Sequence, residues 1–157
     1  MYRNILVPID ESAAAERGLE EAIKLASATG AKIRLVHVVN ELSGVPSDLP
    51  GVDFRSIVED LTRSGRTLLT RAEERVRAAG IDADTQLVET WGGRAGEQAV
   101  ELAKDWPADL IVCGTHGRRG VRRMVMGSDA EYIARHSPVP VLLVRSSTVP
   151  NAEASLG

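Results

Sequence analysis

Short apolar runs alternate with stripes of apolar residues at helical spacing along most of the chain. Residues 4–10 form an apolar run that closes on an aspartate, a pattern typical of a buried strand. Ser12 is a favourable N-cap for the helix that we predict over residues 12–30, where apolar residues recur every three or four positions until Gly30 ends the pattern. Residues 32–40, rich in β-branched side chains, predict a second strand.

The same alternation continues to residue 145. An apolar stripe over residues 52–79 predicts a long helix, although Gly65 lies inside the stripe and weakens the pattern for one continuous helix. The remaining predicted elements are a polar strand suited to a sheet edge at 83–90, a helix at 94–106, an apolar strand at 108–114, a short helix at 128–136 and a strand at 139–145.

Strands that alternate with helices predict a parallel β-sheet covered by helices on both faces, the α/β class. The chain has 157 residues and shows neither a tandem repeat nor a composition break that would mark a second domain. We therefore expect one domain over residues 1–146, followed by a flexible C-terminal tail at 147–157.

The composition of the chain argues against nucleic-acid-binding and membrane proteins. Aromatic residues make up only 3% of the chain and the formal net charge is −3, which is unlike a domain that binds nucleic acid. No apolar run approaches the length of a membrane span, and the single cysteine excludes an intramolecular disulfide and fits a reducing compartment. We therefore expect a cytoplasmic protein with neither a nucleic-acid nor a membrane partner.

A glycine-rich loop, "GTHGRRGVRRMVMGS", joins the predicted strand at 108–114 to the short helix that follows. Gly114, Gly117 and Gly127 form its spacing pattern, and Ser128 opens the helix. Glycine lets the backbone approach a ligand closely, and a helix N-terminus offers free N–H groups to an anion. The loop therefore predicts a phosphate site, in which His116 is a candidate polar contact.

The arginines of this loop, Arg118, Arg119, Arg122 and Arg123, allow two interpretations. Guanidinium groups suit phosphate oxygens, so one or two of these side chains could close over a ligand. Alternatively, they lie in an exposed loop and only keep the protein soluble. Both interpretations stay open at the level of the sequence.

The position of the loop supports a binding site. In an open parallel sheet, ligands bind beyond the carboxyl ends of the strands, where the strand order reverses. The first and fourth predicted strands commonly flank that point, which would bring the turn at Asp10 close to the loop that starts at Gly114. Asp10 either stabilises the turn beside Ser12 or accepts hydrogen bonds from ribose hydroxyls, and one position could serve both roles.

Four blocks of the sequence together resemble the universal stress protein family. They are "ILVPIDES", "LVHVV", "ADLIVCGTHGRRG" and "GSDAEYIARHSPVPVLLVR", and their order and the Gly-x2-Gly-x9-Gly-Ser spacing match that family's nucleotide-binding signature. The resemblance implies a flavodoxin-like (adenine nucleotide alpha hydrolase-like) three-layer sandwich with a five-stranded parallel sheet in the order 3-2-1-4-5.

The resemblance also implies the ATP-binding branch of the family, with AMP or ADP as alternative ligands and Mg²⁺ as an accompanying ion. Pro8 and Asp10 would lie beside adenosine, and the backbone of Val38 would meet adenine. With the loop residues, the expected binding site comprises Pro8, Asp10, Val38, Gly114, His116, Gly117, Arg118, Gly127 and Ser128.

Three further residues lie close to this site in the sequence. His37 falls in a buried strand pattern, which favours a core histidine over a catalytic base. Cys113 ends an apolar strand, and we interpret it as a small apolar residue that lines the pocket, with no cause for a lowered pKa. Asp129 would repel phosphates if it faced them, so we expect it in the first helical turn, facing solvent.

The sequence lacks the motifs of several enzyme classes. The sequence contains no Gly-x4-Gly-Lys-Ser/Thr loop, no Gly-x-Gly-x-x-Gly after the first strand and no Gly-x-Ser-x-Gly. The three histidines show no spacing expected of a metal site, and no base for activating water is evident, so we predict neither a metal ligand nor a catalytic residue.

The sequence therefore favours a nucleotide-binding regulatory or sensor module in stress response over an efficient enzyme. The alternatives are a slow Mg²⁺-dependent ATPase that uses the same pocket and an interaction module with a vestigial pocket. The apolar run Val139 to Val144 is expected at a sheet edge, which invites pairing, so we predict a homodimer through this strand with Leu143 as the side chain to test.

Overall fold

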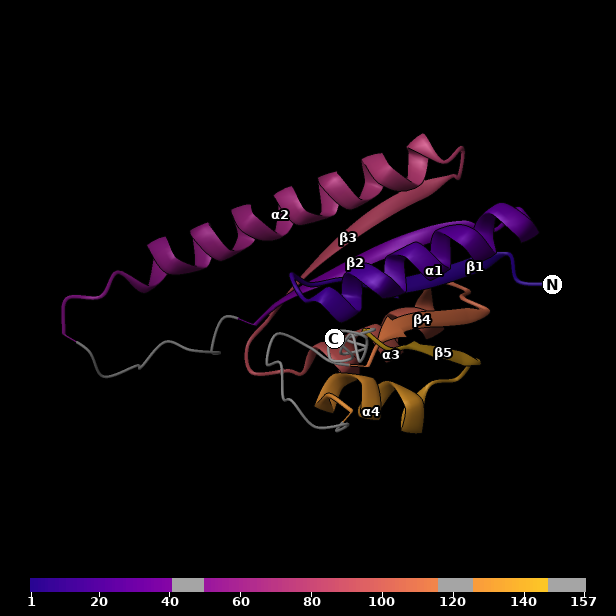
Figure 1. The fold of residues 1–157 in the computed structure, drawn as a ribbon. Helices are drawn as coiled ribbons and strands as arrows, with labels where there is room; N and C mark the ends of the chain where they lie inside the picture. The colour runs from indigo at the N-terminus through magenta and orange to yellow at the C-terminus, as the bar shows by residue number, and fades with distance from the viewer. Residues whose placement is uncertain (41–49, 116–125, 147–157) are drawn as a thin grey trace, which may run out of the picture.

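One parallel sheet of five strands organises the described part of the chain, which comprises residues 1–40, 50–115 and 126–146 of a computed structural model (Figure 1). Strands and helices alternate as the sequence pattern predicts. The elements are β1 (Asn4–Pro8), α1 (Ala13–Thr29), β2 (Lys32–Asn40), α2 (Phe54–Ala78), β3 (Ala83–Thr90), α3 (Ala95–Asp105), β4 (Leu110–Gly114), α4 (Ser128–His136) and β5 (Val141–Val144).

The strand order is β3-β2-β1-β4-β5, and every adjacent pair is parallel. This confirms the predicted flavodoxin-like order, including the place of β3 at one edge and β5 at the other. Because all strands run the same way, their carboxyl ends meet at one edge of the sheet. The chain order reverses between β1 and β4, so a crevice opens where those two strands end.

Two aliphatic clusters hold the layers together. Helices α1 and α2 cover one face of the sheet, and α3 and α4 cover the other (Figure 1). Leu19 and Val76 pack on the first face and Val100 and Ile133 on the second, each at most 2% exposed. Burying a side chain of this size contributes about 1.5–3 kcal/mol, so both helix layers are firmly attached although no buried member of either cluster is aromatic.

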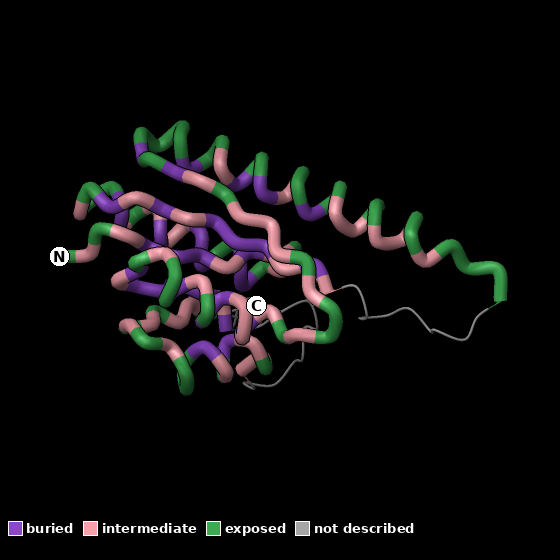
Figure 2. The backbone as a smooth tube through the Cα atoms, turned by 180° about the vertical axis from the view of Figure 1, so that it is seen from behind, coloured by how far each residue is buried: buried purple, intermediate pink, exposed green. Residues whose placement is uncertain are grey.

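Helix α2 is continuous, with Gly65 buried inside it. A Cβ atom at this position would lie 2.7 Å from Cδ2 of His37 and 2.9 Å from Cδ1 of Leu87, so the glycine lets the helix approach β2 and β3. The first buried residue of α2 is Gly65. The part of the helix before it, residues 54–64, is intermediate or exposed and is therefore pink and green in Figure 2. The interruption that Gly65 suggested in the sequence is therefore absent; close packing is the reason for the glycine.

Helix α1 lies against the end of β4. A Cβ atom on Gly114 would lie 2.5 Å from the carbonyl oxygen of Ala14, and one on Gly18 would lie 3.2 Å from the Gly114 nitrogen. Gly114 is not among the glycines with positive φ. The contact between the two backbones is thus sufficient reason for a glycine at position 114, whatever the loop that follows it binds.

The ends of α1 follow the sequence prediction. The Ser12 hydroxyl accepts a hydrogen bond from the Ala15 N–H at 3.1 Å, and Gly30 closes the helix with a φ of 72°. Within the described residues, no helix has an apolar stretch that could cross a lipid bilayer.

Candidate functional site

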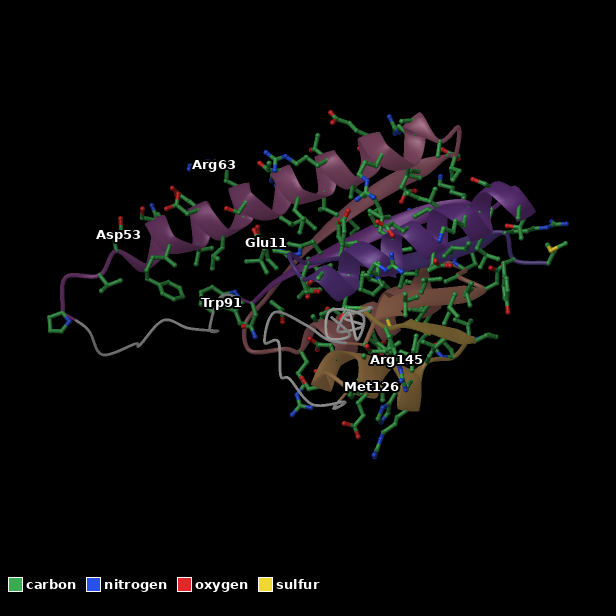
Figure 3. All side chains as sticks on the ribbon, in the orientation of Figure 1. Glu11, Asp53, Arg63, Trp91, Met126 and Arg145 are labelled. Atoms are coloured by element: carbon green, nitrogen blue, oxygen red, sulfur yellow. The ribbon has the colours of Figure 1, made fainter. Side chains whose placement is uncertain are left out.

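A cavity of about 690 Å³ opens at the carboxyl end of the sheet. It is bounded by the ends of β1, β2 and β4, the turn into α1, the middle of α2 and the first residues of α3 and α4. Glu11 at the turn into α1 and Met126 just before α4 mark two of its sides (Figure 3). The volume lies in the range of sites for small molecules and cofactors.

The structure brings the described members of the predicted site together. The wall of the cavity includes Pro8, Asp10, Val38, Gly114, Gly127 and Ser128. The other predicted residues, His116, Gly117 and Arg118, lie outside the described residues, as do Arg119, Arg122 and Arg123.

The N-terminus of α4 presents unpaired amides to this cavity. Gly127 is the N-cap, and its own N–H donates to the Thr115 carbonyl at 2.6 Å, so it is not free. The N–H groups of Ser128, Asp129 and Ala130 precede the first hydrogen bond of the helix, which Glu131 makes to Gly127 at 2.9 Å. None of these three amides has an acceptor among the described residues. Together with the positive end of the helix dipole, they form an arrangement suited to an anion.

Asp129 has a role that the sequence did not reveal. The expectation that it faces solvent was wrong: it is half-buried, and its Oδ1 accepts a hydrogen bond from the Gly96 N–H at 2.8 Å. The N-cap of α3 is Arg94, whose side chain makes no capping bond, so Asp129 performs that function from α4. A Cβ atom on Gly96 would lie 2.8 Å from the Asp129 carbonyl oxygen, which explains the glycine at this contact.

Asp10 stabilises the turn that follows β1. Its Oδ1 accepts a hydrogen bond from the Ser12 N–H at 2.7 Å, and the side chain is half-buried at the cavity wall. The structural interpretation of Asp10 is therefore confirmed, and a role toward a ligand is compatible with its position.

Val38 presents unpaired backbone groups to the cavity. Along β2, the Lys32 N–H donates to Arg3 and the Val36 carbonyl accepts from Ile9, each at 2.8 Å, so even-numbered residues direct their backbone groups toward β1. The pairing of β1 with β2 ends at Pro8 and Val36. The N–H and C=O of Val38 therefore point to the space beyond β1, with no hydrogen-bond partner within the described residues.

His37 is a core residue, as the sequence pattern favours. It is 7% exposed, and its Nδ1 lies 2.9 Å from the Ile9 carbonyl oxygen. A carbonyl can only accept, so this contact assigns the proton to Nδ1. The sequence pattern did not reveal that the ring also lines the cavity.

Cys113 is buried beside the cavity, and burial raises the pKa of its thiol to about 12, with the charge of Asp129 adding to the effect. The thiol is thus protonated at neutral pH, which confirms its interpretation as a small apolar residue. Among the described residues, no group of three or more His, Cys, Asp or Glu side chains could hold a metal ion.

Several wall residues were missed by the sequence-based prediction. Leu61, Ser64 and Leu68 come from α2, and Arg94 is the one arginine or lysine in the described part of the wall. The helical stripe identifies Leu61 and Leu68 as apolar contacts but gives no sign that they overhang a cavity. Arg94 belongs to no recognisable sequence motif. It lies in the cavity wall because the start of α3 packs beside the start of α4.

A doubly wound α/β domain with a ligand-sized crevice where the strand order reverses is the class of protein that the fold and the cavity define. The chain belongs to the universal stress protein family, because the sequence model described as "Universal stress protein family" matches residues 1–145.

Individual relatives agree with this assignment. A Staphylococcus haemolyticus protein named as a universal stress protein is 31% identical over 154 residues, which cover 95% of this chain and 88% of that protein. The structure of the universal stress protein UspA from Lactobacillus plantarum is similar with a TM-score of 0.79 and 26% identity, covering 92% of this chain and 98% of that one. A universal stress protein solved in complex with cAMP has a TM-score of 0.66 and 26% identity, with 93% and 98% covered.

The capping role of Asp129 gives a stability prediction. We expect Asp129→Ala to lower the free energy of unfolding by about 1 kcal/mol, because the Gly96 N–H loses its acceptor. Asp129→Asn keeps an acceptor oxygen and should cost less. Urea denaturation measures both changes.

Glu131→Ala is the matched control, since Glu131 is also in the first turn of α4 but forms an exposed ion pair with Arg135. Its loss should change stability by less than about 0.5 kcal/mol. Equal effects of Asp129→Ala and Glu131→Ala would contradict the capping role.

Proposed function

We propose that this protein binds an adenine nucleotide, foremost ATP, and acts as a dimeric regulatory or sensor module in stress response. The observation that carries the proposal is the set of unpaired amides of Ser128, Asp129 and Ala130 at the mouth of the cavity. They offer a phosphate chain donors that the fold has already oriented, at the positive end of α4.

The remaining walls suit the other parts of a nucleotide. The free N–H and C=O of Val38 match the acceptor at N1 and the donor amino group on the edge of adenine. Asp10 lies between the end of β1 and α1, where a carboxylate oxygen can accept from ribose hydroxyls. A relative of 26% identity was solved with cAMP, an adenine nucleotide, which supports the same ligand class here.

The preference for ATP over AMP rests on the glycine loop. Its spacing is the one that the family's ATP-binding branch carries, and its four arginines would offset the charge of a triphosphate. Asp129, which could oppose that charge, is tied to the start of α3 through its Oδ1. Binding of the nucleotide would regulate the protein through a difference in affinity between two states of the domain.

A proline at position 128 tests the phosphate site. Proline is tolerated at the first position of a helix, and Gly127, with φ of −59° and ψ of 152°, already has the backbone conformation that suits a following proline. Ser128→Pro thus removes one free N–H and the hydroxyl, whereas Ser128→Ala removes the hydroxyl alone. We expect Ser128→Pro to weaken ATP binding by about tenfold relative to Ser128→Ala, since hydrogen bonds to charged groups are the stronger ones.

Calorimetric titration with ATP and with adenosine measures the effect, and circular dichroism checks the fold. Adenosine, which lacks phosphate, should bind both variants equally. The phosphate assignment fails if the two variants bind ATP equally well. A wild-type protein that binds no adenine nucleotide would instead identify the pocket as vestigial.

We further propose that two copies pair through β5, the edge strand that hydrogen-bonds only to β4 in the described structure. None of its residues is fully buried, and Leu142 is 40% exposed. Leu143 packs against the cluster beneath α3 and α4, so it is a poorer test residue than its neighbour. A second copy would cover Leu142 and the free backbone edge.

Leu142→Lys should therefore give a monomer in analytical ultracentrifugation, at concentrations where the wild type sediments as a dimer. Val52→Lys is the matched control, because Val52 is 41% exposed but lies before α2, away from β5. Retention of the dimer by Leu142→Lys, or its loss in both variants, would rule out an interface through β5.

A further inference from the structure

The hydrogen bond between His37 and Ile9 lies where the pairing of β1 and β2 would otherwise continue. In a parallel pair, a residue of one strand donates its N–H to one partner residue and accepts from the residue two positions further along. Val36 accepts from the Ile9 N–H at 2.8 Å, so the next bond in this ladder would run from the Val38 N–H to the Ile9 carbonyl. That bond is not formed within the described structure.

The Ile9 carbonyl bonds instead to the imidazole of His37. Nδ1 lies 2.9 Å from the Ile9 oxygen, and both residues are 7% exposed. A buried carbonyl is normally hydrogen-bonded, and here the donor is the ring of His37, the residue that precedes Val38 on β2. The Val38 N–H is thereby left without its ladder acceptor and faces the cavity.

Gly65 makes this arrangement sterically feasible. A Cβ atom on Gly65 would lie 2.7 Å from Cδ2 and 3.2 Å from Nε2 of the His37 ring. The missing side chain on α2 therefore gives the imidazole the room to turn its Nδ1 toward Ile9. Beyond Ile9, the Ser12 N–H donates to Asp10 Oδ1, so the chain leaves the line of β1 and turns into α1. Within the described residues, the Val38 N–H has no other acceptor.

We propose that His37 is a positioning residue for the base of the nucleotide. By donating to the Ile9 carbonyl, it ends the β1–β2 ladder at Val36 and keeps the peptide of Val38 free to read the edge of adenine. This inference rests on the proposed function for its ligand, whereas its effect on the ladder concerns the protein alone. The Val38 N–H selects an acceptor at N1 of the purine, so hypoxanthine, whose N1 carries a proton, should be rejected.

Two variants separate this role from packing. His37→Asn keeps an N–H donor close to the position of Nδ1, whereas His37→Leu fills the space without one. We expect wild type and His37→Asn to bind AMP about tenfold or more tightly than inosine 5′-monophosphate, a usual penalty for a mismatched buried hydrogen bond. In His37→Leu this preference should vanish. Each ratio is taken within one variant, so a loss of stability alone does not change it.

Amide hydrogen exchange of the ligand-free protein gives the second readout. The Val38 N–H should exchange fast in the wild type and in His37→Asn, and become protected in His37→Leu, where it can take over the Ile9 carbonyl. The proposal is overturned if His37→Leu keeps the preference for AMP, if His37→Asn loses it, or if Val38 is already protected in the wild type. A wild type that binds neither nucleotide refutes the proposed function, and exchange at Val38 then still decides whether His37 ends the ladder.

Discussion

Backbone hydrogen bonding at the carboxyl edge of the sheet is the constraint on which the site depends. A strand that ends before its neighbour leaves peptide groups of that neighbour unpaired. The pairing of β1 with β2 ends at Val36, and the peptide groups of Val38 are left without a partner on β1. A helix that begins there adds free N–H groups, as α4 does from Ser128 to Ala130. Buried peptide groups are costly to leave unsatisfied, so these groups are stable only while water or a ligand reaches them. The cavity of about 690 Å³ provides that access.

Residues that build this cavity also hold the fold together. Asp129 caps α3 from the first turn of α4, and Gly114 brings the end of β4 against α1. Asp10 fixes the turn into α1, and Gly127 ties the start of α4 to Thr115. The free amides at the start of α4 are therefore positioned by contacts that join α1, β4, α3 and α4. Such an arrangement is pre-organised: a ligand would gain hydrogen bonds without first ordering its donors.

Local patterns were sufficient to predict the helices and strands, and the resemblance to a family supplied the order of the strands in the sheet. The apolar runs, the Ser12 cap and the Gly30 stop each depend on neighbouring residues, and the strand order followed from the resemblance of four blocks. Contacts between distant residues were not predictable in this way. Gly65 looked like a break in a helix because its partners, His37 and Leu87, lie on other elements. Asp129 was expected in solvent because the sequence does not show that α3 begins beside α4.

Amide chemical shifts in a nitrogen-15 labelled protein, followed by NMR during titration with ATP, test the central claim most directly. The account predicts that the largest changes fall on the N–H groups of Ser128, Asp129 and Ala130 and on that of Val38, the unpaired amides in the cavity wall. Saturable binding that leaves these amides unmoved, with the changes on another face of the domain, would contradict it.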